Sequence, residues 1–195
     1  MLVLASRTQL MITIVLASLI AATRGHHFDL LNHLPSASWA AFFLAGVYVR
    51  SLWVFPGLLA EAAALDYVAI TWGGVSSFCV SPAYGFLLPA YGALWVAGLW
   101  YATRHHESLA TLVPLTISML IGVSLCELLS SGSFYYLSGR FDETSLAGLS
   151  ERMIQFFPRA LFAFLFYVGA AGVLHVAFRA AGSVAATVNR LRTSG

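Results

Sequence analysis

The chain has 195 residues, of which 59% are hydrophobic and only 9% are charged. Soluble domains carry a charge on about a quarter of their residues, so this composition excludes a soluble domain and indicates a polytopic membrane protein. The net charge is +2, and all ten basic residues are arginines scattered along the chain. That scatter gives no basic patch for nucleic acid.

Apolar segments recur along the whole chain, and a membrane-spanning helix needs about 20 such residues. The sequence predicts an all-α fold with six transmembrane helices in a single domain, 1–195. The first segment follows Arg7 and ends in small residues, so it also resembles a signal peptide, but we expect it to be retained as a span. Two longer loops are expected at Arg24–Ser36 and Ser131–Arg152. The predicted spans are 8–23, 37–54, 56–72, 83–103, 109–130 and 153–178.

Arginine placement predicts the orientation, because loops on the cytoplasmic side are enriched in positive charge. If the N-terminus is cytoplasmic, six arginines lie inside and Arg24, Arg140 and Arg152 lie outside. Both termini are then cytoplasmic, and both longer loops lie on the outer face. The prediction is a multi-pass membrane protein with its ligand chemistry on the outer side.

Cys79 lies in a stretch that is unfavourable for helix, between Gly73-Gly74 and Pro82. Non-helical backbone at membrane depth survives only where protein buries it or where it lines a polar cavity. The thiol is therefore a candidate ligand for a soft metal or a candidate nucleophile. Two alternatives stay open: an inert buried cysteine, and a disulfide to Cys126.

Four further residues are candidates for the same cavity. Asp66 lies six residues before the expected helix end at Trp72, about 9 Å deeper, and an intramembrane carboxylate needs a partner. Tyr84 follows Cys79 across Pro82 and should face the same space. His27 opens the first outer loop and could fold over the cavity, while Arg152, at the outer start of the last span, could bind an amide or a phosphate.

The segment Ser76-Ser77-Phe78-Cys79-Val80-Ser81-Pro82-Ala83-Tyr84-Gly85, with six short spans and a decorated outer face, resembles the BtuM family of cobalamin transporters. That family is a solitary relative of the S-components of energy-coupling-factor (ECF) transporters. The resemblance implies an S-component-like fold and cobalamin uptake across a bacterial inner membrane. It implies that Cys79 ligates the cobalt of cobalamin, with removal of the cyano ligand from cyanocobalamin, and that His27, Asp66, Tyr84 and Arg152 line the pocket.

The expected partners are cobalamin and the lipid bilayer. Ala17-Ser18-Leu19-Ile20-Ala21 resembles the small-residue face by which S-components dock an ECF transmembrane coupling subunit, although such spacing also serves ordinary helix packing. No nucleotide-binding motif occurs, so an ATP-driven step would need separate ATPase subunits.

The alternative function is a membrane cysteine transpeptidase or protease of the exosortase kind. It would use Cys79 as nucleophile, His27 as base and Arg152 as the partner of the oxyanion. A third interpretation, a haem or quinone protein, requires histidines at matching depths on neighbouring spans, and the sequence does not place them so.

Overall fold

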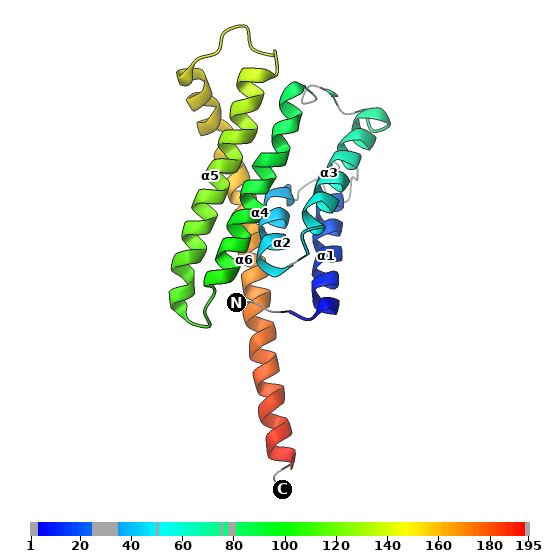
Figure 1. Cartoon of the computed structure of the whole chain (residues 1–195), viewed down its shortest axis with the longest axis vertical. Coiled ribbons are helices and arrows are strands. Elements are labelled where there is room, and N and C mark those ends of the chain that lie inside the picture. Colours follow the sequence, from blue (N-terminus) through cyan, green and yellow to red (C-terminus); the bar gives the residue numbers. More distant parts are fainter. Residues whose placement is uncertain (1–3, 25–34, 50, 75, 78–80, 194–195) are drawn as a thin grey trace.

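The computed structural model describes residues 4–24, 35–49, 51–74, 76–77 and 81–193, with 182–193 as backbone only. In this part of the chain all the regular structure is helical, so the predicted all-α fold class is confirmed. The helices run roughly along one long axis (Figure 1). They are α1 (Ser6–Arg24), α2 (Ser38–Tyr48), α3 (Val54–Thr71), η2 (Pro82–Phe86), α4 (Leu87–Arg104), η3 (Leu109–Thr111), α5 (Leu112–Leu137) and α6 (Leu146–Thr193).

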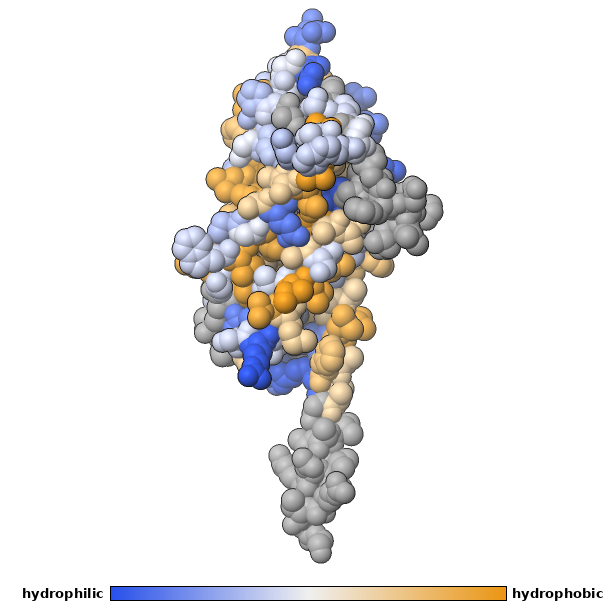
Figure 2. Space-filling model, turned by 90° about the vertical axis from the view of Figure 1, so that its right-hand side faces the viewer, coloured by the Kyte–Doolittle hydropathy of each residue, from blue (hydrophilic) through white to orange (hydrophobic). Residues whose placement is uncertain are grey.

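Among the described residues, five helical segments are long and apolar enough to cross a membrane: α1, α3, η2 with α4, η3 with α5, and α6. Helix α3 shows how the chain matches a bilayer. Trp53 and Trp72 flank it, and their side chains are 84% and 74% exposed. The 19 residue steps from one tryptophan to the other correspond to about 28 Å of helix, close to the ~30 Å hydrocarbon core. Tryptophan prefers the two membrane interfaces. Figure 2 shows apolar side chains gathered between more polar ends.

The predicted span at 37–54 does not form, and six spans are not confirmed. Helix α2 has only 11 residues, about 16 Å, which is half of a hydrocarbon core. Its side chains are buried on every side, among them Phe42 and Phe43 at 0% exposure. The apolar run therefore reflects a helix enclosed by protein rather than by lipid. The chain turns before α3, and Pro56 stands in the first turn of α3, where its missing N–H costs no hydrogen bond.

The connection between the last two helices is shorter than predicted, because α5 continues through Ser131 to Leu137 and α6 begins at Leu146. The serines of this polar run bond within the helix: Ser131 Oγ donates to Glu127 Oε1 at 2.8 Å, and Ser133 Oγ donates to the Ser130 carbonyl at 3.1 Å. Helix α5 ends before Gly139, whose φ of +66° is a left-handed conformation that suits glycine. Residues 138–145 therefore form the turn between α5 and α6.

The bundle has two ends, named here by their turns. The α4–α5 end carries the turn after Arg104, and the α5–α6 end carries the turn 138–145. Helix α1 begins and α6 ends toward the α4–α5 end (Figure 1). That these parts of the chain face the cytoplasm stays a prediction.

Helices α2 and α4 cross with their backbones in close contact, through Gly46 and Gly98. A Cβ atom added to Gly46 would lie 2.1 Å from the Trp95 carbonyl oxygen, and one added to Gly98 would lie 2.1 Å from the Phe43 carbonyl oxygen. Small residues allow this approach where no hydrophobic effect drives helices together within lipid. The two glycines therefore fix the position of α2 in the bundle.

Gly46→Ala and Gly98→Ala should each destabilise the protein by about 1–3 kcal/mol, because backbone rather than a flexible side chain would have to move. Thermal unfolding in detergent measures the effect. Gly92→Ala in α4 is the matched control, since its added Cβ would meet only Phe55 Cζ at 3.8 Å. Equal stability of the Gly98 and Gly92 variants would contradict the proposed crossing.

Candidate ligand pocket

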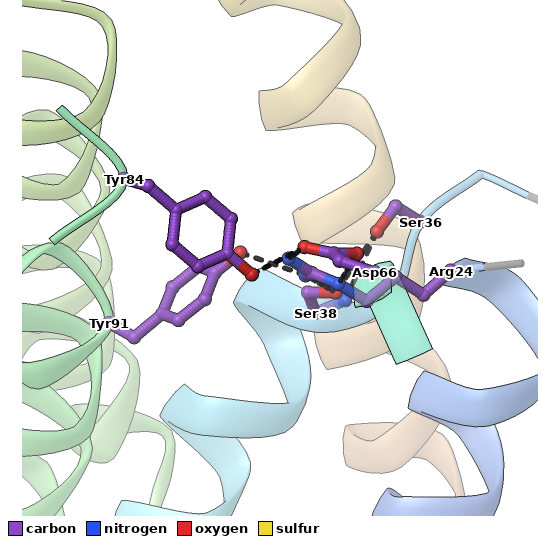
Figure 3. A network of polar contacts seen from close by, with 6 residues as sticks. All are labelled: Arg24, Ser36, Ser38, Asp66, Tyr84 and Tyr91. Atoms are coloured by element: carbon purple, nitrogen blue, oxygen red, sulfur yellow. Dashed lines mark hydrogen bonds and ion pairs between the residues drawn. The ribbon is translucent and has the colours of Figure 1, made fainter. Parts of the chain in front are cut away.

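Arg24 and Asp66 form an ion pair in the interior of the bundle (Figure 3). Arg24 Nε donates to Asp66 Oδ1 and Arg24 Nη2 donates to Asp66 Oδ2, both at 2.7 Å. The side chains keep only 13% and 25% of their exposure. This two-point geometry is the strong form of an arginine–carboxylate contact. The partner that the intramembrane Asp66 requires is therefore Arg24.

Three hydroxyl groups complete this cluster. Arg24 Nη1 donates to Ser38 Oγ and to the Tyr91 hydroxyl, both at 3.0 Å. The Tyr84 hydroxyl donates to Asp66 Oδ2 at 2.7 Å. Figure 3 shows the side chains converging from α1, α2, α3, η2 and α4. Arg24 and Asp66 neutralise each other's charge, and the three hydroxyl groups form further hydrogen bonds with them.

Local structure places each group of the cluster. Arg24 is the last residue of α1, and the preceding Thr23 accepts the Ala37 N–H at 3.0 Å, which joins the end of α1 to the start of α2. Tyr91 stacks on Phe42 with 4.4 Å between ring centroids. Tyr84 lies in the short helix η2, which begins at Pro82. The charged pair therefore lies near the end of α1 and the starts of α2 and η2.

A pocket of about 530 Å³ lies beside this cluster. Asp66, Tyr84 and Arg152, three of the candidates chosen from the sequence, all line it, so the structure brings them together around one space. Its wall combines arginine, carboxylate and hydroxyl groups with apolar and aromatic side chains. The lining residues are Thr23, Arg24, Ser36, Asp66, Ala69, Ile70, Ser76, Ala83, Tyr84, Leu87, Tyr91, Ser130, Ser131, Phe134, Arg152 and Phe156.

Arg152 lies in the second turn of α6 rather than in a loop. Its guanidinium carbon lies 4.6 Å from the Phe141 ring centroid and 5.3 Å from the Phe156 ring centroid. Aromatic faces attract a cation and hold the planar guanidinium in place. Within the described part of the chain, Arg152 has no acidic partner. Arg152 also lines the pocket, where a guanidinium can bind an anionic or amide group.

His27 and Cys79 lie outside the described residues. The helix break before Cys79 is present: α3 ends at Thr71, and Gly74 has a left-handed φ of +69°. Cys126 is a free cysteine with 0% exposure, so the disulfide alternative is wrong for this structure. The described side chains contain no group of three histidine, cysteine or acidic residues able to hold a metal ion.

Sequence reasoning missed Arg24, Ser38 and Tyr91 as parts of the site. Arg24 was counted among the outer loop charges, because it follows an apolar run and precedes a glycine. A signal did exist. An intramembrane acid requires a basic partner at similar depth, and Arg24, at the end of the first apolar segment, was a candidate for it.

Comparison of the chain with protein-family models finds no match, and comparison with curated proteins finds no relative. The class of the protein therefore follows from its fold and composition. It is an all-helical protein whose long apolar helices are those of a multi-pass membrane protein. It carries a charged, aromatic-lined pocket at one end of the bundle.

Asp66→Asn and Arg24→Gln should each destabilise the protein by about 2–4 kcal/mol, because each leaves a buried charge without its partner. The double variant should lose less stability than the sum of the two, since it leaves no unpaired charge. Unfolding midpoints in detergent test this. Tyr84→Phe, which removes one hydrogen bond to Asp66, is the control and should cost about 1 kcal/mol. Strict additivity of the two charge variants would contradict the pairing.

Proposed function

We propose that the protein takes up cobalamin across the inner membrane, with the Cys79 thiolate bound to cobalt in the pocket beside Arg24 and Asp66. The observation that carries this proposal is the position of the residues that flank Cys79. Ser76, three residues before it, and Ala83, four residues after it, both line the pocket. Described residues on both sides of the segment that carries the thiol therefore line the same pocket.

The chemistry of the wall supports a corrin ligand. Cobalamin combines an apolar ring with amide arms and a phosphodiester, and ligand pockets usually pair apolar walls with a few placed polar groups. Tyr84 and Phe134 supply aromatic surface, and Arg152 supplies a cation without an acidic partner among the described residues. Asp66, fixed by Arg24, accepts hydrogen bonds in a set orientation. His27 is proposed to close over the pocket from the first loop.

The pocket is smaller than cobalamin, so only part of the ligand would enter it. The cobalt face would point toward the Cys79 segment, and the rest of the corrin would lie at the mouth. A soft thiolate suits an axial position on cobalt. When cyanocobalamin binds, the cobalt–sulfur bond would form as the cobalt–carbon bond breaks, and cyanide would leave with its electron pair. Transport would then be served by an ECF coupling subunit and ATPases, or proceed without them.

Purified protein incubated with cyanocobalamin should show an altered corrin absorbance spectrum and release cyanide. Cys79→Ala should abolish both, because alanine has no sulfur to bind cobalt. Cys126→Ala is the matched control: it removes the other, fully buried thiol and should leave both readouts unchanged.

An unaltered spectrum in the wild-type protein, or the same spectrum in Cys79→Ala and wild type, would overturn the cobalt–sulfur bond. Absence of corrin binding, together with alkylation of Cys79 by an electrophilic peptide, would favour the cysteine transpeptidase. In that function Arg152 would face the oxyanion.

A further inference from the structure

A second polar cluster lies at the α4–α5 end, away from the pocket. Its centre is a pair of imidazole rings, His105 in the turn after α4 and His175 in α6, whose centroids are 5.7 Å apart at 77°. The structure places them in contact, although 70 residues separate them along the chain.

Hydroxyl groups hold the Nδ1 atom of each ring. The Tyr101 hydroxyl lies 2.8 Å from His105 Nδ1, and Thr111 Oγ1 lies 3.3 Å from the same atom. The Tyr48 hydroxyl lies 3.4 Å from His175 Nδ1. A hydroxyl can donate to the bare nitrogen of a neutral imidazole and can accept from the N–H of a protonated one. These contacts therefore hold the two rings in place, and the proton balance depends on burial and on the charges nearby.

The charged groups around the pair come from the same elements. Glu107, in the turn, forms an ion pair with Arg179, one helical turn beyond His175 on α6. Arg104, at the end of α4, lies over the Trp100 ring at 5.1 Å from its centroid. At His105, Glu107 favours a proton more strongly than Arg179 opposes it. Burial and the neighbouring His175 are therefore the main features that disfavour an imidazolium there.

The pair connects three parts of the bundle. Tyr48 is the last residue of α2, Tyr101 belongs to the last turn of α4, and His175 belongs to α6. Around His175, α6 carries exposed apolar side chains, with Leu174 at 58% and Val176 at 67%. The contacts of His175 with Tyr48 and His105 therefore join α6 to α2 and to the α4–α5 turn at this end.

We propose that His105 and His175 form a proton-binding site that holds α6 against α2 and the α4–α5 turn when both rings are neutral and releases it when one is protonated. Protonation places a positive charge on a partly buried ring and near Arg179. A second proton would add repulsion between the two rings. This inference does not depend on the identity of the pocket's ligand.

The direction of the pH effect follows from His105, which lies outside the spanning helices. Burial lowers the pKa of His105 below its ordinary value of about 6.5, and the neighbouring His175 and Arg179 act in the same direction. The unfolded chain then binds the proton more readily than the folded one. The stabilisation is complete above about pH 6.5 and is lost as pH falls below that value.

Thermal unfolding of the full-length protein in detergent tests the site, at about pH 7.5 and at about pH 5.5, on either side of the ordinary histidine pKa. The midpoint of the wild type should fall by roughly 3 °C at the lower pH. His175→Gln and His105→Gln should each lose most of this dependence, and the double variant should lose no more than one of them. His106→Gln is the matched control, because His106 is next to His105 in the sequence but its exposed side chain is not part of the ring pair.

An undiminished pH dependence in His105→Gln and His175→Gln would overturn the proposal. If these variants fail to fold, NMR titration of histidine-labelled wild-type protein remains decisive. The site predicts that the titrations of His105 and His175 are coupled and that the pKa of His105 lies below the ordinary value of about 6.5. Six imidazoles with independent, ordinary midpoints would contradict it.

Discussion

The ion pair of Arg24 and Asp66 is the interaction on which the arrangement of the bundle depends. A charge in an apolar bundle is costly unless it meets its counter-charge with good geometry and its remaining hydrogen-bonding groups are satisfied. Arg24 meets this requirement with four hydrogen bonds, to Asp66, Ser38 and Tyr91. These contacts determine where α1 ends, where α2 begins and how α3 faces α4. The pocket lies along the same contacts.

Helix α2 links the ion pair to the opposite end of the bundle. It is too short to span a bilayer, yet Ser38 at its first residue contacts Arg24 and Tyr48 at its last contacts His175. The ten residue steps from Ser38 to Tyr48 separate the two polar clusters by about 15 Å. The backbone contact of Gly46 with α4 holds α2 in place between them. A buried helix enclosed by longer ones thus connects the pocket end of the bundle to the α4–α5 end.

The sequence predicted the helical class and the positions of α1, α3 and α4 closely, because each is a long apolar run bounded by arginine, glycine or proline. It misjudged α2, since hydropathy cannot distinguish a helix buried in protein from one facing lipid. It placed the end of α5 too early at the serines, whose hydroxyls in fact bond back into the helix. Asp66 was predicted from the energetic cost of an intramembrane carboxylate, and Tyr84 and Arg152 from their positions in the sequence. All three line one pocket.

The arginine partner and the histidine pair could not be predicted in the same way. Both join residues from distant segments, 42 residues apart for Arg24 and Asp66 and 70 for the histidines. Which of several polar side chains meet depends on helix rotation and crossing. Close contacts such as that of Gly46 and Gly98 set those rotations, and a single sequence contains no direct record of them.

Cobalt X-ray absorption of the protein loaded with cobalamin tests the central functional claim most directly, because it reports the atoms bound to the metal. The account predicts a sulfur atom in the first coordination shell of cobalt in the wild-type protein and its loss in Cys79→Ala. A shell containing only nitrogen, oxygen or carbon in the loaded wild-type protein would contradict it.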